Sequence, residues 1–387
     1  MAEHNFEAVL EDVIEWRRHF HQFPELSYEE VNTSQFVYDT LTSFGNIEVT
    51  RPTKTSVMGR LVGSEAGQVL AMRADMDALP IHEETELPYA SKNPGVMHAC
   101  GHDAHTAMLL GAAKLLSQKQ LTGEVRFIFQ HAEELFPGGA KEMVEAGVME
   151  GVDKVIGLHV FSMIPEGKIA IAYGPFTANS DVFDIEIIGK GGHSSEPHET
   201  IDPIAIGAQV VSNIQQIVAR NINPADKVVV SITEFHGGTA KNIIPDTIKI
   251  GGGVRSFNQE VREEVSQRIG QIVKGITEAH NATYVYDYVF GYGSVNNNHQ
   301  VTAEIEELIT EELGSDYILE TPPMMGGEDF SAFSNEVPGC FIGIGAAFTQ
   351  EHEKDRNFPH HHPKFSIDEK SLENGLRILA KAPFKLL

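Results

Sequence analysis

The chain has 387 residues, 41% of them hydrophobic and 22% charged, which is enough to bury the core of one large domain or of two smaller ones. Its formal net charge of −26 disfavours binding to nucleic acid or to an anionic membrane surface, because both need clusters of basic residues. Two cysteines, Cys100 and Cys340, are too few for a disulfide framework, and neither a signal peptide nor a membrane-spanning stretch is predicted, so we expect a cytoplasmic protein.

Two amphipathic helices are predicted first, over 6–20, where Pro24 follows, and over 28–44, where Gly45 follows. Short strands come next, each closed by a polar or glycine-rich turn and often by a helix: 57–62, 69–72, 125–129, 155–158 and 341–344. Further helices are predicted at 104–116, 301–313 and 368–381. This alternation predicts an α/β domain built on a mostly parallel mixed sheet with helices on both faces.

Between residues 181 and 290 the pattern changes. The predicted order is strand, helix, strand, strand, helix, strand, over 182–188, 201–219, 227–235, 247–254, 260–278 and 283–290. This is the order of a ferredoxin-like α+β domain. We therefore predict a discontinuous first domain, 1–180 and 291–387, with a second domain, 181–290, inserted into it.

The segment HACGHDAHT, from His98 to Thr106, holds three histidines, a thiol and a carboxylate. Cys100 and His102 are two residues apart, so they cannot share one face of a helix and need a loop. Metal ligation is what brings soft sulfur, imidazole and carboxylate groups together in a chain without disulfides. We therefore predict a metal site here, with a buried cysteine flanked by capping polar residues as the alternative.

Other polar residues follow the ends of predicted strands. Asp75, Glu133, Glu134 and His159 each come after such a strand, and the histidines at 360–362 come after the last strand, across a longer loop. Open α/β sheets build their sites at the carboxyl ends of strands, so we expect these segments to converge. Taken alone, His159 also fits a satisfied histidine of the core.

Glu133 and Glu134 are adjacent, and adjacent side chains outside a helix point in different directions. One of them can bind a metal ion while the other acts as the base toward an activated water. A solvated acidic pair at the start of a helix is the alternative. Asp75 and Asp77 are two residues apart, and one of them can orient a ligand histidine.

Two glycine-rich loops of the inserted domain carry polar side chains, His193 in 189–195 and Asn242 in 237–245. Their residue order fits neither a P-loop nor a dinucleotide-binding fingerprint, which disfavours a phosphate cradle. Arg255 ends a strand in a domain with few cations, so it is a candidate clamp for a substrate carboxylate. A structural ion pair is the alternative for Arg255.

Taken together, these residues resemble the M20 metallopeptidase family, and within it the amidohydrolase branch of hippurate hydrolases, aminoacylases and auxin-conjugate hydrolases. The resemblance covers nearly the whole chain, from RRHFHQFPE at 17–25 to HHPKF at 361–365. It implies that Glu133 is the general base and that the thiolate bridges two metal ions. The metal ligands that it implies are Cys100, His102, Glu134, His159 and His361.

The resemblance also assigns supporting roles. Asp75 would position or polarise the site, and Arg73 stands where the broader family has a ligand histidine, for which His102 would compensate. The inserted domain would be a lid and a homodimer interface, in which His193 stabilises the oxyanion. The positions associated with substrate contact are Asn242 and Arg255.

We therefore predict a dinuclear metal-dependent amidohydrolase that cleaves the amide bond of N-acetyl or aroyl amino acids, or of similar small conjugates. The donors suit two divalent ions per chain, Mn²⁺ or Zn²⁺, with Co²⁺ as a further option. A dipeptidase or carboxypeptidase on the same scaffold is the alternative enzyme. A metal-dependent binding protein without turnover is the rival from another class, and the presence of Glu133 argues against it.

Overall fold

The structure is a computed structural model that describes residues 3–387. It divides into two compact units. The first unit comprises the chain up to Phe176 together with Val295–Pro323 and Asp329–Leu387, and the second comprises Thr177–Ser294 and Met324–Glu328. The predicted insertion at 181–290 lies inside the second unit, to which the short segment Met324–Glu328 also belongs.

The first unit is built on an eight-stranded sheet in the order β1-β2-β4-β3-β5-β16-β6-β15. In chain order its strands are β1 Glu48–Thr50, β2 Val57–Val62, β3 Glu65–Asp75, β4 Thr122–Gln130, β5 Lys154–Pro165, β6 Ile169–Ile171, β15 Ile318–Glu320 and β16 Gly339–Ala347. The central strands β4, β3, β5 and β16 pair in parallel, whereas β1–β2, β2–β4 and β16–β6 are antiparallel. This confirms the predicted mostly parallel mixed sheet, whose central strands are apolar because both faces are covered.

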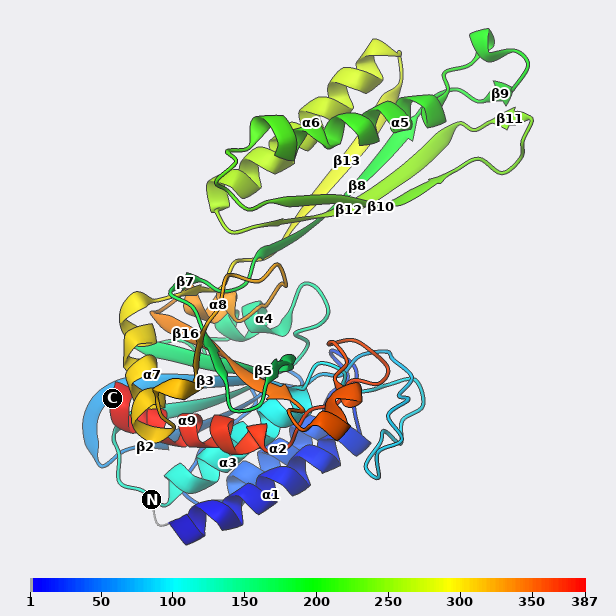
Figure 1. The fold of residues 1–387 in the computed structure, drawn as a ribbon. Helices are drawn as coiled ribbons and strands as arrows, with labels where there is room; N and C mark the ends of the chain where they lie inside the picture. Colours follow the sequence, from blue (N-terminus) through cyan, green and yellow to red (C-terminus); the bar gives the residue numbers. More distant parts are fainter. Residues whose placement is uncertain (1–2) are drawn as a thin grey trace. The chain divides into compact units, whose positions relative to one another are not determined.

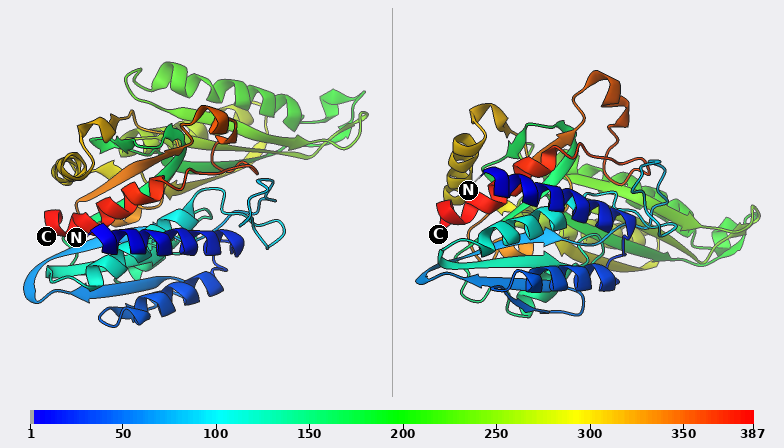
Figure 2. Two further views of the ribbon diagram at one scale, coloured as in Figure 1. Left: turned by 60° about the horizontal axis from the view of Figure 1, so that its bottom comes forward. Right: turned by 90° about the horizontal axis from the view of Figure 1, so that it is seen from below.

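Helices cover both faces of this sheet (Figure 1). They are α1 Glu3–Gln22, α2 Val31–Ser43, α3 His102–Ser117, α4 Gly139–Glu145, α7 His299–Glu312, α8 Ser331–Ser334 and α9 Ser371–Leu386. Helices α1, α3 and α9 lie on one side, and α4 and α8 lie on the other. Figure 2 shows α1 and α9 from further directions, next to α3.

Helix α3 is the central helix of this layer, and nearly all of its residues are buried. It packs against α1 at Gly111, where an added Cβ would come within 2.4 Å of the Val13 side chain. Any larger residue at that position would force the two helices apart. Because α3 is held on all sides, the residues at its amino end have fixed positions beside Asp75 at the end of β3 and beside Val160 in the middle of β5.

Several predicted boundaries of the first unit differ from the structure, and three of them bear on the site. Helix α2 begins at Val31 rather than at residue 28, because Tyr28 has a positive φ of 68° that a helix cannot include. Strand β3 runs through Arg73 to Asp75, because its backbone still pairs with β4 there, and the buried charges of Arg73 and Asp75 pair with each other. Strand β5 continues past His159, whose backbone still pairs with Gly343 of β16.

The second unit has β8 Asn179–Ile188, α5 Pro203–Ile214, β10 Val229–Gly237, β12 Thr247–Ser256, α6 Gln259–Ala279 and β13 Thr283–Tyr292. Its strands form an antiparallel sheet in the order β10-β12-β8-β13, which confirms the predicted ferredoxin-like arrangement (Figure 1). The side chains of Asp202 and Asn258 cap the amino ends of α5 and α6. Helix α5 ends at Ile214, before the predicted end at 219, and a π-helical turn, Ile217–Asn221, follows it.

Short paired segments complete the topology. In the first unit β7, Gly174–Pro175, pairs with β14, Asn296–Asn297, and in the second β9, Gly192–His193, pairs with β11, Ile243–Ile244. Among residues 3–387, no helix combines the length and the apolar character that crossing a membrane requires.

Candidate metal centre

Cys100 and His102 are held in place by the glycine between them. Gly101 has a φ of +97°, a conformation that residues with a side chain rarely adopt. An added Cβ at Gly101 would also lie 2.3 Å from the Val160 side chain. Helix α3 begins at His102, so the turn at Gly101 places the thiol in the loop and the imidazole at the first position of a buried helix. The predicted loop-then-helix arrangement around this motif is therefore present.

The donor atoms of the first unit gather in overlapping groups, within which all atoms lie within 4.8 Å of one another. One group is Cys100, His102 and His159, and another is Cys100, Glu134 and His361. These two groups share only the Cys100 sulfur. A third group, His102, Glu133 and Glu134, joins the base candidate to the same cluster.

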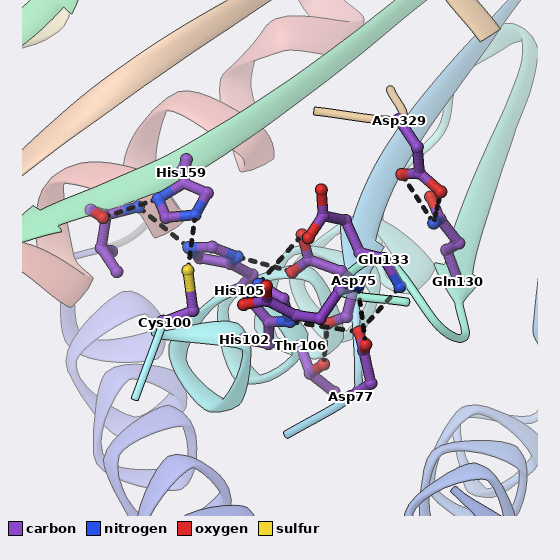
Figure 3. Close-up of polar contacts among 12 residues, drawn as sticks. Asp75, Asp77, Cys100, His102, His105, Thr106, Gln130, Glu133, His159 and Asp329 are labelled. Atoms are coloured by element: carbon purple, nitrogen blue, oxygen red, sulfur yellow. Dashed lines mark hydrogen bonds and ion pairs between the residues drawn. The ribbon is translucent and has the colours of Figure 1, made fainter. Parts of the chain in front are cut away.

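The histidine rings are oriented by hydrogen bonds to their other nitrogens. His159 Nδ1 lies 2.7 Å from the carbonyl oxygen of Val160, so it donates its proton there. This leaves the lone pair of His159 Nε2 toward Cys100 Sγ, 3.4 Å away (Figure 3). His102 Nδ1 lies 3.2 Å from Asp77 Oδ1, which turns His102 Nε2 toward the cluster. Both rings are held as metal-binding histidines usually are.

The electrostatics of the cluster favour a cation. Burial alone would lower the pKa of His102, but the charges of Asp75, Asp77 and Glu134 raise it to about 10. His102 Nε2 is buried and has no hydrogen-bond partner among residues 3–387. Burial and then the nearby carboxylates raise the pKa of the Cys100 thiol well above its usual value, so the thiolate needs a positive charge beside it. A divalent ion would meet both needs, since coordination deprotonates a thiol.

One oxygen of Glu134 faces two imidazoles. Glu134 Oε1 lies 3.2 Å from His361 Nε2 and 3.9 Å from His102 Nε2. The interaction with Glu134 raises the pKa of His361, because it outweighs the effect of burial, which alone would lower that pKa. Sulfur, imidazole and carboxylate donors around one space are the ligands that zinc, manganese and cobalt accept in proteins, so the residues fit a dinuclear centre.

The comparison with protein families decides the identity of the scaffold. The family described as peptidase family M20/M25/M40 matches residues 71–385, which include every residue of the cluster. The chain belongs to this M20 family. The resemblance inferred from the motifs is thus confirmed.

Relatives within M20 extend this result. An N-acyl-L-amino acid amidohydrolase of Geobacillus stearothermophilus is 60% identical over 293 residues, which are 75% of this chain and 79% of that protein. A thermostable carboxypeptidase of Saccharolobus solfataricus is 44% identical over 372 residues, which are 95% and 93% of the two chains. The crystal structure of Bacillus subtilis YXEP, described as a dinuclear metal-binding peptidase from the M20 family, has a TM-score of 0.83 and 37% identity, and covers 97% of this chain and 98% of that one.

Among the three consecutive histidines, the structure brings His361 to the cluster. His360 is partly buried, and its ring centroid lies 5.0 Å from that of Phe365 and 5.2 Å from that of His159. The backbone N–H of Lys364 donates to Nδ1 of His362, which turns that ring to its own loop. His361 has a φ of +64°, and its N–H donates to the Ala99 carbonyl oxygen, so the chain places its half-exposed side chain next to Cys100.

Asp77, rather than Asp75, contacts the predicted ligand His102 through Nδ1. Asp77 also accepts the backbone N–H groups of Glu133 and Glu134, each at 3.0 Å, and so ties the base candidate to the histidine. Spacing alone left the choice between the two aspartates open, and the resemblance favoured Asp75. Asp75 lies beside the cluster, with Oδ2 3.7 Å from His102 Nε2.

Asp75 is held by Arg73 and by His105, a residue to which sequence reasoning assigned no role. His105 Nδ1 lies 2.6 Å from Asp75 Oδ1, and His105 Nε2 accepts the N–H of Val160 at 2.9 Å (Figure 3). Both ring nitrogens are therefore used, so His105 supports the ligands rather than joining them. The sequence feature that could have pointed to His105 is its position one helical turn after His102 on the same helix.

The N-terminal motif also supports the centre. Arg17 and His21 of α1 lie 2.9 Å and 2.8 Å from Asp103 Oδ2, and all three side chains are fully buried. Burial would raise the pKa of Asp103, but the charges and hydrogen bonds of these partners hold it well below its usual value. The motif thus fixes the first turn of α3 next to His102.

The residues predicted in the inserted domain lie in the second unit. His193 and Asn242 are close together, because β9 pairs with β11 and the Ser194 N–H donates to the Asn242 carbonyl oxygen. Arg255 lies near the opposite end of β12 from this pair, so the structure does not bring the three side chains together. Arg255 Nη1 donates to the carbonyl oxygens of Asp181 and Val254. The roles of all three residues stay predictions.

The buried arginine at position 73 gives a test of the scaffold. Arg73 Nη1 and Nη2 each lie 2.8 Å from a carboxylate oxygen, of Asp75 and of Asp329, and its side chain is fully buried. We expect Arg73→Met to lower the free energy of unfolding by about 3–5 kcal/mol, because it leaves buried carboxylates without their cation. Denaturant titration measures the change.

Arg60→Met is the matched control, since Arg60 pairs with Glu48 and Glu124 but is 33% exposed. Its expected loss is within about 1 kcal/mol. Equal losses in the two variants would show that the Arg73 network carries no special stability.

Proposed function

We propose that the protein hydrolyses the amide bond of N-acyl amino acids at a centre of two divalent metal ions. The observation that carries the proposal is the pair of donor groups that share only the Cys100 sulfur, with Glu133 in a third group beside them. The Geobacillus relative, an N-acyl-L-amino acid amidohydrolase at 60% identity, supports the substrate class.

Bound divalent ions would supply a polarised scissile carbonyl and a water of lowered pKa. Glu133 is 8% exposed, and its backbone is fixed by Asp77. Its carboxylate takes a proton from the attacking water and passes it to the amide nitrogen as the C–N bond breaks. The products are the free acid and the free amino acid, so Glu133 returns to its starting state after each turnover.

His193 is proposed as the donor to the oxyanion. The N–H of Ser195 lies 3.2 Å from His193 Nδ1 and donates to it, so the neutral ring carries its proton on Nε2. An exposed ring with Nε2–H outward is the form that can donate a hydrogen bond to a developing negative charge.

A peptidase activity is the second candidate, because the Saccharolobus relative is a carboxypeptidase. The metal-loaded protein is therefore assayed on N-acetyl amino acids, hippurate and unblocked dipeptides, with elemental analysis of metal per chain. Faster turnover of N-acyl substrates supports the proposal, and a preference for unblocked dipeptides replaces it with the peptidase. Absence of turnover on every substrate with Mn²⁺, Zn²⁺ and Co²⁺ would favour the alternative of a metal-dependent binding protein without catalytic activity. Homodimerisation through the second unit and a cytoplasmic location stay predictions.

A further inference from the structure

The turn that carries Glu133 is held by two buried carboxylates. It follows β4 and presents three consecutive backbone N–H groups, those of Ala132, Glu133 and Glu134. Asp77 accepts the second and third. The first goes to Glu30, whose Oε1 lies 2.8 Å from the Ala132 nitrogen. Consecutive backbone N–H groups of a turn can form a nest for negative charge, and here the carboxylates of Asp77 and Glu30 accept these N–H groups.

Ala132 needs such an anchor. Its φ of +49° lies in the left-handed region, which is uncommon for a residue with a side chain. This conformation directs the following residue, Glu133, toward His102 and Glu134. A turn in a sparsely populated conformation persists only where its surroundings fix it. The hydrogen bond to Glu30 is the contact that fixes the N–H side of this peptide.

Burying the Glu30 carboxylate for this contact is energetically unfavourable. Its side chain is fully buried, and burial followed by the charge of Asp77 raises its pKa to about 7. Its hydrogen bonds are all ones that it accepts: from Ala132, from the Tyr28 N–H at 3.0 Å and from the Thr55 hydroxyl at 2.9 Å. A buried carboxylate is unfavourable without such partners, and none of these partners is a cation. Stability alone gives little reason for a carboxylate here.

We propose that Glu30 is a positioning residue for the general base, which it holds at its productive place by fixing the peptide of Ala132. The inference rests on the proposed function of Glu133. Ser27 of the same segment reinforces the arrangement, because its hydroxyl donates to Asp77 Oδ2 at 2.7 Å. The segment between α1 and α2 thus supports both carboxylates of the nest.

Kinetics of three variants at Glu30 test the inference. We expect Glu30→Ala to lower kcat about 100-fold, the effect of displacing a catalytic group by about 1 Å, with KM and metal content unchanged. Glu30→Gln keeps an oxygen for the Ala132 N–H and can donate its amide to Thr55, so it is expected to recover most of kcat. Glu30→Asp keeps the charge but withdraws the oxygens, so its kcat is expected to fall below that of Glu30→Gln. This variant carries the test if Glu30→Ala does not fold.

Glu29→Gln is the matched control, because Glu29 is the exposed neighbour of Glu30 and is expected to keep the wild-type kcat. Wild-type kcat in both Glu30→Ala and Glu30→Asp, measured well below their melting temperatures, would overturn the inference. A fall in kcat that follows loss of metal would overturn it as well. A Glu133→Gln variant separates the two proposals: if it is active, the proposed function fails. If it is inactive while the Glu30 variants are normal, only the inference about Glu30 fails.

Discussion

Glu133→Gln is expected to keep its metal ions and to lose about 10²–10⁴ in kcat, the range that general base catalysis contributes. The amide has the shape of the carboxylate and can still accept hydrogen bonds, but it cannot take a proton from water. The backbone of Glu133 is held by Asp77 independently of the side chain, so the turn is expected to keep its place.

The measurements are metal per chain by elemental analysis and steady-state kinetics on an N-acetyl amino acid. Glu145→Gln is the control, since Glu145 lies on α4 with its side chain 68% exposed. A near-normal kcat in Glu133→Gln would remove Glu133 from the role of base. Loss of metal in the same variant would instead assign it to the ligands.

Cys100→Ala is expected to have the largest effect on metal content. The Cys100 sulfur belongs to both donor groups, so its removal is expected to weaken both metal positions of the proposed centre at once. Loss of a supporting residue alone typically costs about 10–100-fold in metal affinity, and loss of a shared ligand is expected to cost at least about 100-fold. Since a ligand at 100 times its Kd stabilises the folded state by about 2.7 kcal/mol, the melting temperature in the presence of metal is expected to fall as well.

Titration with Zn²⁺ or Mn²⁺ followed by calorimetry measures this loss. Cys340→Ala removes the other cysteine, which is buried in β16, and is expected to keep wild-type metal affinity. Cys100→Asp replaces the thiolate by another anionic donor and is expected to bind metal better than Cys100→Ala. Wild-type affinity in Cys100→Ala would show that the sulfur does not bridge the ions.

The residues that follow apolar strands were predictable, whereas most of the residues that support them were not. Glu133, Glu134 and His159 could be predicted because polar side chains that follow apolar strands mark the site edge of an α/β sheet. Cys100 could be predicted because it shares a short segment with histidines and an aspartate. His361 was selected from three histidines by resemblance, and the structure places it with the others because of a left-handed backbone that no pattern specifies.

Supporting residues lack such a signal because their partners are distant in sequence. Glu30 reaches Ala132, which lies 102 positions further along the chain, and Arg73 reaches Asp329 across 256 positions. Read alone, Glu30 is one of two adjacent glutamates before a helix, a common surface pattern. Asp75 is the last residue of β3 and Asp77 follows it, and the sequence did not show which of the two would contact Nδ1 of His102. Contacts of this kind become visible only once the chain is folded.

The order in which the donors occur along the chain has a consequence for biosynthesis. Cys100, His102 and His159 are all present once residue 159 has been translated, whereas the group of Cys100 and Glu134 also needs His361, which is translated much later. The ribosome must therefore continue from residue 159 to His361 before the second group of donors is complete. Premature termination just before His361 would leave a product that keeps the donor group of Cys100, His102 and His159 but lacks the group that includes His361. Such a truncation would therefore impair metal binding as well as folding.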